Sequence, residues 1–484
     1  MSAPEGPFVI GVDSSTQSTK ALVVDAATGQ VLARGQAPHT VSPGDRRESD
    51  PEEWWQALRT AVGQCGRAAG EAAAVSVAGQ QHGLVTLDGA GDPVRPALLW
   101  NDVRSAPQRD RLVADLGGPT AWAERVGSVP APAFTVTKWA WLRENEPEAA
   151  RSTAAVRLPH DFLTERLTGQ PGTDRGDASG TGWWSSATGS YDTQILELAG
   201  LDPALLPPVL SSGEAAGTVK ETGDGFLTAG TLVATGTGDN MAAALGLGLL
   251  PGQPVLSLGT SGTVYAVSDR RPADPSGTVA GFADAHTGWL PLACTLNCTL
   301  AVDRMAALLS RDREDVEAGG RVTALPFLDG ERTPDLPYAT GLLSGLQHAT
   351  TGGQVLQAAY DGAVFALLRA LDRVLAEGGG GGAAAEQDTP LLLIGGGAKG
   401  AAWRETVRRL SGRAVQVPGA QELVALGAAA QAAGLLLGED PGAVARRWRT
   451  AQGASYEPVP RDDDALARLS ATLEGAGALL GRRP

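Results

Sequence analysis

The sequence predicts a two-domain α/β protein, and three observations support this prediction. At 484 residues the chain is too long for one hydrophobic core, and its length corresponds to roughly two to four domains. Residues 8–12 and 21–25 are apolar runs on either side of a polar turn, which indicates a β-meander instead of a strand followed by a helix. A similar strand–turn–strand unit recurs at residues 254–267. We therefore expect two similar halves, residues 1–248 and 249–484.

The other elements follow from residue spacing. Residues 51–69 have helical spacing, with Asp50 as N-cap and Pro51 at the first helical position. Residues 378–387, which begin with a glycine run, are expected to form a loop without a chemical role. We further expect strands at residues 31–33, 74–78, 254–258, 263–267 and 390–394, and helices at residues 354–376 and 403–410.

Charge and composition argue against several classes of protein. The net charge is -15 and no basic stripe is present, so we expect no nucleic-acid partner. The most apolar run, residues 241–250, is about half the length that crosses a bilayer, so we expect no membrane partner. The three cysteines form no CxxC pair and no signal peptide is visible, which favours the reducing cytoplasm.

Asp13 opens a turn rich in hydroxyl groups after the first strand. Successive backbone N–H groups of such a turn can bind phosphate oxygens, and a carboxylate beside them calls for a cation such as Mg²⁺. The alternative is a hairpin turn whose Asp and Ser side chains satisfy only their own backbone. Lys20, one of only four lysines, ends this segment as a candidate phosphate contact or as a solvated surface lysine.

Two glycine-rich turns lie in the second half. The turn at residues 259–262 resembles many turns when taken alone, but together with the turn after Asp13 it provides a second candidate phosphate loop. The glycines at residues 395–397 could let the backbone approach an adenine or ribose, since no Cβ intervenes. A tight strand-to-helix turn is the alternative for this second segment.

Asp239 lies in a segment of small residues just before a predicted helix. A carboxylate at this position could accept the proton of a hydroxyl group that attacks a γ-phosphoryl group. As an alternative, Asp239 could be only the N-cap of the helix.

Polar groups also gather near predicted strand ends at Gln81, His82, Asp102 and Arg104. Sugar recognition needs mixed donors and acceptors of this kind together with an apolar platform, for which Trp54 is a candidate. A lone histidine is, however, more often a structural residue, and Trp54 on a helix is more often part of the core.

Taken together, these motifs resemble the FGGY family of carbohydrate kinases over nearly the whole chain. The resemblance implies an actin/hexokinase-type (ribonuclease H-like) ATPase fold with a central interdomain cleft, and a last helix that could pack back on the first domain. The segments that carry it are residues 11–16, 50–55, 78–83, 99–102, 134–142, 238–240, 258–262, 326–334, 341–361 and 395–403.

The resemblance also implies roles for individual residues. Asp239 would be the base for the terminal hydroxyl of the sugar, and Asp13 would hold Mg²⁺ through water beside the phosphates of ATP. The implied sugar-binding residues are Gln81, His82, Trp54, Asp102 and Asn240. The implied nucleotide-binding residues are Thr16, Lys20, Gly259, Thr260, Gly396, Gly397 and Ala398.

The expected substrate within the family is D-xylulose, because Gln-His-Gly followed by Trp-Asn-Asp favours it over glycerol or gluconate. Another ketopentose or a polyol is the alternative, and a homodimer is left open. Three residues depart from the common family pattern: Gln81 replaces a frequent methionine, His160 a common lysine, and Gly400 a serine or other polar residue.

Two non-enzymatic classes are weighed against the kinase. An actin-like ATP-binding filament protein has no use for Asp239, and a catalytically inactive sugar sensor would be expected to lose Asp13 or Asp239. Both carboxylates are present.

Overall fold

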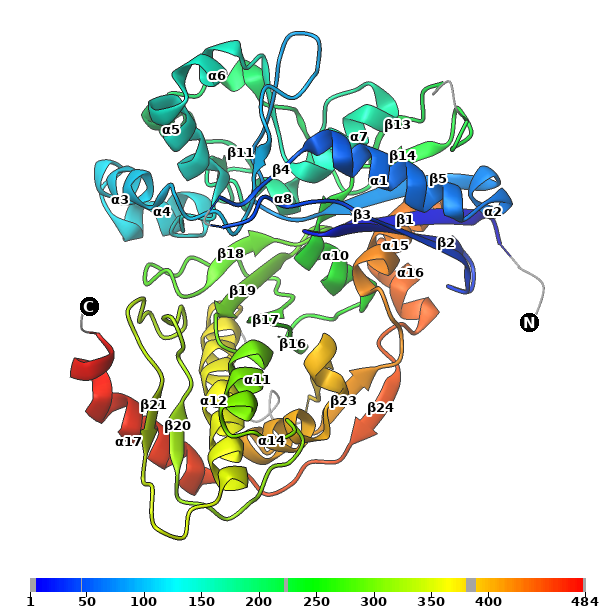
Figure 1. Ribbon diagram of the computed structural model, residues 1–484. Coiled ribbons are helices and arrows are strands. Elements are labelled where there is room, and N and C mark those ends of the chain that lie inside the picture. Colours follow the sequence, from blue (N-terminus) through cyan, green and yellow to red (C-terminus); the bar gives the residue numbers. More distant parts are fainter. Residues whose placement is uncertain (1–5, 45, 222–224, 380–388, 482–484) are drawn as a thin grey trace.

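The structure of the chain is a computed structural model, which describes residues 6–44, 46–221, 225–379 and 389–481. It has two α/β halves, one above the other in Figure 1, each built on a seven-stranded mixed sheet with helices packed against it. The predicted two-domain α/β architecture is therefore confirmed.

The first sheet begins with the predicted β-meander. Strands β1, β2 and β3 pair antiparallel in sequence order, and β5 lies parallel to β1 on its other side. Its strands are β1 (Phe8–Ser14), β2 (Ser18–Asp25), β3 (Val31–Pro38), β5 (Ala72–Gly79), β13 (Ala215–Thr218), β14 (Leu232–Ala234) and β15 (Thr237–Gly238). The helices of this half are α1 (Pro51–Gln64), α2 (Arg67–Gly70), α3 (Ala106–Asp115), α4 (Pro119–Val126), α5 (Thr135–Asn145), α6 (Pro147–Ser152), α7 (Pro159–Thr168), α8 (Arg175–Ala178), α9 (Thr193–Ala199) and α10 (Asp239–Gly246).

The second sheet repeats the core of the first. The order β19-β17-β16-β22-β23 matches β3-β2-β1-β5-β14 in both neighbours and strand directions. Its strands are β16 (Pro254–Leu258), β17 (Gly262–Ala266), β18 (Ala280–Ala283), β19 (Trp289–Thr295), β22 (Leu391–Ile394), β23 (Val415–Pro418) and β24 (Gly453–Tyr456). The later part of the chain also contains β20 (Thr323–Leu325), β21 (Leu342–Ser344), α11 (Thr299–Leu308), α12 (Gly352–Glu377), the 3₁₀ turn η2 (Gly396–Lys399), α14 (Ala401–Ser411), α15 (Leu423–Leu437), α16 (Pro441–Trp448) and α17 (Asp463–Leu480).

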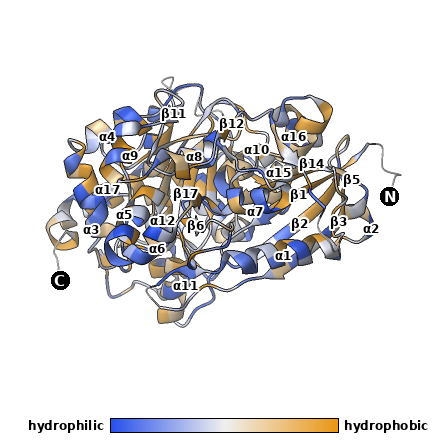
Figure 2. Cartoon of the chain, turned by 90° about the horizontal axis from the view of Figure 1, so that it is seen from above, coloured by the Kyte–Doolittle hydropathy of each residue, from blue (hydrophilic) through white to orange (hydrophobic). Residues whose placement is uncertain are grey.

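Helix α1 shows how local sequence sets an element. Asp50 caps it by accepting from the Glu52 N–H, and Pro51 is its first residue, as predicted. The helix ends at Gln64, earlier than the expected residue 69, because Gly66 takes a positive φ of 60° before the short α2. In Figure 2 hydrophilic and hydrophobic residues alternate along α1, as expected of a helix that buries one side.

Two helices late in the sequence return to the first sheet. Helix α15 packs on β1, β5 and α10, and α16 packs on α15. A Cβ at Gly427 of α15 would lie 1.8 Å from the Ala242 carbonyl oxygen, and one at Gly246 of α10 would lie 2.1 Å from the Leu423 carbonyl oxygen. The two helices can approach this closely only because both positions are glycine.

The last helix behaves differently from expectation. Helix α17 packs on β20, α12 and α14 of its own half, where its apolar residues Leu469 and Leu480 join a small core around Phe327. The elements that pack back on the first sheet are thus α15 and α16, not α17.

Most of the glycine-rich segment, residues 380–388, lies outside the described residues. No single helix among the described residues is long and apolar enough to cross a membrane. Only α15 and α16 taken together, which are bent by 118° relative to each other, have the length and apolar composition of a membrane span.

Candidate active site

The register of the first sheet brings two carboxylates to one edge. Asp13, at the end of β1, is the parallel neighbour of Ala78 in β5, and Ala78 in turn neighbours Thr237 of β15. Asp239 follows β15 directly as the first residue of α10. Because the carboxyl ends of parallel strands meet at one edge, Asp13 and Asp239 lie close enough for the charge of Asp239 to act on Asp13.

Asp13 is 5% exposed, and its Oδ1 atom has no hydrogen-bond partner among the described residues. Burial raises the pKa of Asp13 to about 7, and the charge of Asp239 adds to the rise, while Lys20 opposes it. A buried carboxylate oxygen without a donor, facing a second carboxylate, is an arrangement that a divalent cation would neutralise.

Asp239 is held in one orientation by its neighbour. Its Oδ1 accepts from the backbone N–H of Asn240 at 2.8 Å and from the Asn240 side-chain amide at 3.0 Å. The N-cap position of α10 belongs to Gly238, so Asp239 is a helical residue and not the cap considered as its alternative role. Burial raises the pKa of Asp239 to about 7, and the charge of Asp177 contributes to the rise.

Gln81 belongs to the same hydrogen-bonded group. The side-chain amide of Asn240 also donates to Gln81 Oε1 at 2.8 Å. The buried Gln81 Nε2 has no partner among the described residues and is thus a donor available to a ligand. Asp239 and its chain neighbour Asn240 therefore form one continuous array with Gln81, which is 159 residues from Asn240 in sequence.

His82 is the fourth polar group beside this array. It takes a positive φ of 65°, and its Nδ1 lies 2.7 Å from the Gly180 carbonyl oxygen. A carbonyl can only accept, so Nδ1 carries the proton and Nε2 keeps its lone pair. Burial, together with the nearby charge of Lys138, lowers the pKa of His82 to about 3, which keeps the ring neutral.

Three residues around His82 were not assigned a role from the sequence. The His82 ring stacks on Phe134 with centroids 4.9 Å apart and lies 5.6 Å from Phe282 of the second sheet. Buried Lys138 donates to the carbonyl oxygens of His82 and Ala133. Phe134 is the N-cap of α5 and Lys138 lies four residues later in its first turn, a spacing that could have marked them as a pair.

Trp54 does not contact this group of residues. It is 0% exposed, donates its indole N–H to Ser49 Oγ at 2.8 Å, and belongs to the core under α1. The expectation that Trp54 contacts the sugar is therefore corrected, because no part of its side chain reaches the surface. The aromatic side chains next to His82 are Phe134 and Phe282 instead.

Asp102 lies in an ion-pair network next to the site. Both of its carboxylate oxygens accept from Arg104, and Oδ2 also accepts from the Arg47 N–H. Arg104 continues to Glu48 at 2.5 Å. The structure thus places Asp102 as an anchor of this loop, with its carboxylate already paired to Arg104.

The β1–β2 turn carries the remaining candidates of the first half. Thr16 Oγ1 accepts from the indole N–H of Trp100 at 3.1 Å, which ties the turn to the loop after β7 (Ala97–Leu98). Lys20 is the cross-strand neighbour of Asp13 and pairs with Glu422 at 2.6 Å, just before α15. Lys20 thus lies beside Asp13 but already has a carboxylate partner.

The nucleotide-side candidates gather in the second half. The Gly259 carbonyl oxygen accepts from Thr299 N and Oγ1 at the start of α11, and a Cβ at Gly397 would lie 2.8 Å from Leu258 Cβ and 2.9 Å from Thr299 Cγ2. Thr260 and Gly396 are exposed at this place, while Ala398 is buried in the core. The β16–β17 turn, η2 and the start of α11 therefore form one surface.

The glycine at position 400, where the family often has a polar residue, is explained by the position of Glu314. Gly400 is the N-cap of α14, and a Cβ there would lie 2.6 Å from Glu314 Oε1. Glu314 Oε2 accepts from the Ala402 N–H at 2.9 Å and so supplies the helix with the acceptor that a polar residue at position 400 would provide.

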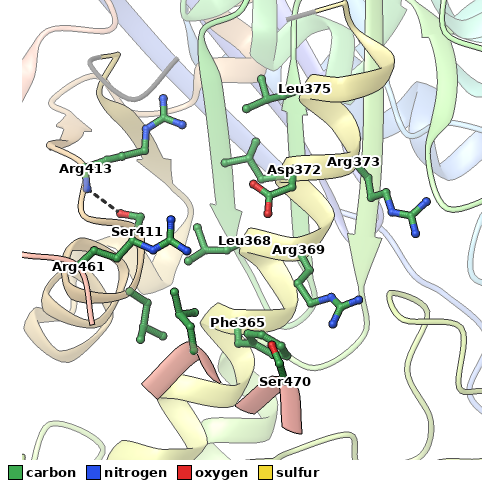
Figure 3. Close-up of a pocket in the computed structure, with 13 residues that line it drawn as sticks. Phe365, Leu368, Arg369, Asp372, Arg373, Leu375, Ser411, Arg413, Arg461 and Ser470 are labelled. Atoms are coloured by element: carbon green, nitrogen blue, oxygen red, sulfur yellow. Dashed lines mark hydrogen bonds between the residues drawn. The ribbon is translucent and has the colours of Figure 1, made fainter. Parts of the chain in front are cut away.

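A large cavity lies away from these residues. It has a volume of about 590 Å³ and lies along α12, with Arg369, Arg373, Arg413 and Arg461 around its apolar floor (Figure 3). It contains none of the residues described above.

Comparison with known proteins identifies the family. The N-terminal and C-terminal domains of the FGGY family of carbohydrate kinases match residues 8–246 and 255–435. The chain belongs to the FGGY family of carbohydrate kinases. This FGGY kinase is 71% identical to a xylulose kinase of Streptomyces rubiginosus, over 100% of this chain and 99% of the relative. It is 70% identical to a xylulose kinase of Streptomyces coelicolor, over 100% of this chain and 99% of that relative.

The same family is seen among solved structures. A xylulose kinase from Bifidobacterium adolescentis superposes with a TM-score of 0.85 at 36% identity, covering 96% of this FGGY kinase and 99% of that chain. The expected fold class and the expected kinase class are both confirmed by these matches.

Proposed function

We propose that this FGGY kinase transfers the γ-phosphoryl group of ATP to the terminal hydroxyl of D-xylulose, giving D-xylulose 5-phosphate. The observation that carries the chemistry is the array of Asp239, Asn240 and Gln81 beside His82 and Asp13. The full-length relatives at 70% and 71% identity support D-xylulose as the sugar.

In the proposed reaction Asp239 accepts the proton of the attacking hydroxyl. Its carboxylate is oriented by Asn240, so the reactive oxygen is held in place before the sugar binds. A base whose pKa lies near 7 is ionised in part at neutral pH and still binds a proton well. The proton goes to Asp239 as the hydroxyl oxygen forms its bond to phosphorus and ADP leaves.

The sugar would be oriented by His82 and Gln81. The neutral His82 offers the Nε2 lone pair to a hydroxyl group, and Gln81 offers the unpaired Nε2 donor. Phe134 and Phe282 support the His82 ring from both halves of the molecule.

Mg²⁺ bound with ATP would be held on the protein side by Asp13. The buried and unpaired Oδ1 fits such a cation, whereas no group of three ligating side chains is found among the described residues. When bound, the cation supplies charge neutralisation between the phosphates and the carboxylates. The ATP phosphates would lie between the β1–β2 turn with Thr16 and the β16–β17 turn with Gly259 and Thr260.

We place this reaction in the reducing cytoplasm, in keeping with the three free cysteines, Cys65, Cys294 and Cys298. A homodimer is compatible with this function but is not required by it, because the proposed groups all come from one chain.

The test is ADP release at fixed MgATP with D-xylulose, D-ribulose, L-ribulose, glycerol and gluconate. A kcat/KM for D-xylulose at least about 10-fold above every other sugar supports the proposal, a margin of about 1.4 kcal/mol. Faster turnover of another ketopentose or a polyol would move the substrate and keep the mechanism. No ADP release with any sugar would favour a non-catalytic ATP-binding protein.

A further inference from the structure

His160 lies in a buried cluster of charges behind the site. Its side chain is 0% exposed, and its Nδ1 lies 2.8 Å from Asp177 Oδ2. Its Nε2 lies 3.2 Å from Asp161 Oδ1 and 3.7 Å from Asp174 Oδ1. One imidazole thus contacts three carboxylates that come from α7 and from the start of α8.

The His160 ring lies directly against the segment that leads to Asp239. A Cβ at Gly236 would be 2.7 Å from His160 Cδ2, so the ring fills the space that a side chain would need. In the same segment Thr237 Oγ1 donates to Asp174 Oδ2 at 2.7 Å. Both contacts are within three residues of Asp239 along the chain.

The same cluster reaches His82 through α8. Asp174 caps this short helix by accepting from the N–H groups of Gly176 and Asp177. Gly180, just after α8, accepts the Nδ1 proton of His82 at 2.7 Å. A displacement of α8 would therefore move the sugar-side histidine as well as the neighbourhood of Asp239.

Charge explains why a cation is needed at this position. Burial lowers the pKa of His160, but Asp161, Asp177 and Asp174 together raise it to about 9, so the ring is positively charged at neutral pH. Without this charge three buried carboxylates would face each other, which is costly in a low-dielectric interior.

We propose that His160 is a positioning residue for phosphoryl transfer, which holds α8 against residues 236–238 and thereby sets the place of Asp239 and His82. This role rests on the proposed kinase function. His160 is too deeply buried to touch the sugar itself, so it acts through these two residues.

The experiment compares His160→Gln, which keeps a hydrogen-bonding side chain but loses the charge, with His160→Lys, which keeps the charge. Tyr360→Phe is the control, because Tyr360 lies on α12 in the other half and the change removes only its hydrogen bond to the Arg313 carbonyl oxygen. For His160→Gln we expect a fall in kcat on the order of 10- to 10²-fold and a higher KM for the sugar, with the KM for ATP unchanged. His160→Lys should recover most of kcat, and Tyr360→Phe should leave kcat and both KM values at wild-type level.

A double-mutant cycle with Asp239→Asn separates the two routes. If His160 acts on turnover by placing Asp239, then His160→Gln adds little to the loss of kcat in the Asp239→Asn background, yet it still raises the KM for the sugar through His82. Independent, multiplicative losses of kcat would overturn the route through Asp239.

If His160 has only a structural role, the expected result is different. His160→Gln with a lower Tm but wild-type kcat and sugar KM would overturn the proposal, and so would a folded His160→Lys as slow as His160→Gln. Should His160→Gln fail to fold, Thr237→Val tests the same packing of residues 236–238 on α8 through the contact with Asp174: a lower kcat at unchanged ATP KM supports the proposal, and wild-type kinetics overturn it. All variants are compared on the sugar that the wild type uses fastest, so a sugar other than D-xylulose would overturn the proposed substrate without affecting this comparison.

Discussion

The proposed chemistry uses two carboxylates whose surroundings differ. Asp239 is oriented by Asn240, whereas the Oδ1 of Asp13 is buried without a donor. The first arrangement suits proton transfer in a fixed direction, and the second suits contact with a cation. In the proposed reaction the same residue type would thus perform two tasks, because the neighbouring donors differ.

Replacing Asp239 with Asn should remove the proton acceptor and preserve the shape. We expect kcat to fall at least ~10²-fold, because a general base contributes ~10²–10⁴. Circular dichroism and thermal unfolding should match the wild type. Near-normal turnover of the folded variant would rule out Asp239 as the base.

The pH dependence of kcat should report the ionisation of Asp239. Burial and the charge of Asp177 raise its pKa to about 7, and only the ionised form accepts a proton. As the pH falls below about 7, kcat should therefore decrease about 10-fold per pH unit, and it should level off above. Initial rates at saturating sugar and MgATP from about pH 5.5 to 8.5 measure this. A rate independent of pH over this range would contradict it.

Replacing Asp13 with Ala should affect the metal more than the sugar. The Mg²⁺ concentration for half-maximal rate should rise at least about 10-fold, as for a residue that acts on a metal through water. D-Xylulose binding, followed by intrinsic tryptophan fluorescence, should stay within about twofold of wild type. A collapse of sugar affinity instead would place Asp13 on the sugar.

The variant Asp13→Ala should also remain stable. The pKa of Asp13 is raised, so the ionised carboxylate is less favourable in the folded chain than in the unfolded chain. Ionised Asp13 therefore lowers the free energy of unfolding at pH values above its unfolded pKa of 3.8. Removing it should not lower the unfolding temperature at neutral pH.

At the scale of elements, the contact between α10 and α15 links the segment that contains Asp239 to the rest of the molecule. Asp239 opens α10, and α15 crosses α10 at two glycines, Gly246 and Gly427. Small residues at such a crossing let two helix backbones touch, so the position of α10 is set by the late helix α15 as well as by its own sheet.

Gly427→Ala should therefore destabilise the protein by about 1–3 kcal/mol, since the new Cβ would overlap the Ala242 carbonyl oxygen. Gly63→Ala on α1 is the matched control: nothing lies within 4 Å of its Cβ position, so the change should stabilise the helix by about 0.5–1 kcal/mol. Urea unfolding of both variants measures the difference. Equal changes in the free energy of unfolding of the two variants would show that the crossing of α10 and α15 tolerates a methyl group.

Elements with strong local signals were predicted well. Asp50 and Pro51 mark the start of α1, and the apolar runs of β1, β2, β16 and β17 lie where the sequence placed them. The end of α1 was placed five residues too late, because the helical spacing continues through Gly66 although its backbone leaves the helical region. Trp54 was misassigned because a tryptophan that stacks on a sugar and one that fills a core look the same in sequence.

At the scale of the whole molecule, Arg175 joins the two halves. It extends from α8 to the β18–β19 hairpin, where it donates to Asp284 Oδ1 at 3.2 Å and to the Gly288 carbonyl oxygen at 2.7 Å. Its guanidinium also lies 5.0 Å from the centre of the Trp289 ring. These contacts hold the second sheet against the half that contains Asp239.

Arg175→Met should loosen this contact and let water compete with the sugar. We expect ATP hydrolysis without sugar, relative to sugar phosphorylation, to rise about 10-fold, because charge-assisted hydrogen bonds contribute about 1.5–3 kcal/mol. Separate assays of ADP and sugar phosphate give the ratio. The control Arg408→Met removes contacts with Glu405 and Glu457 inside one half and should leave the ratio unchanged. An unchanged ratio in Arg175→Met would show that this contact does not control water access.

The sequence by itself determined the two-domain α/β class, the repeated strand–turn–strand units and the kinase family, because these depend on local patterns and on motifs a few residues long. It also singled out Asp13, Gln81, His82 and Asp239. Only the tertiary structure decided which groups meet: Asn240 with Gln81, Phe282 with His82, and His160 with three carboxylates. It likewise moved Trp54 into the core and brought α15, not α17, to the first sheet. The physical reason is that most of these contacts join segments from distant parts of the chain, and the His160 cluster joins two separate helices, so all of them depend on sheet register and helix packing, which no local pattern records.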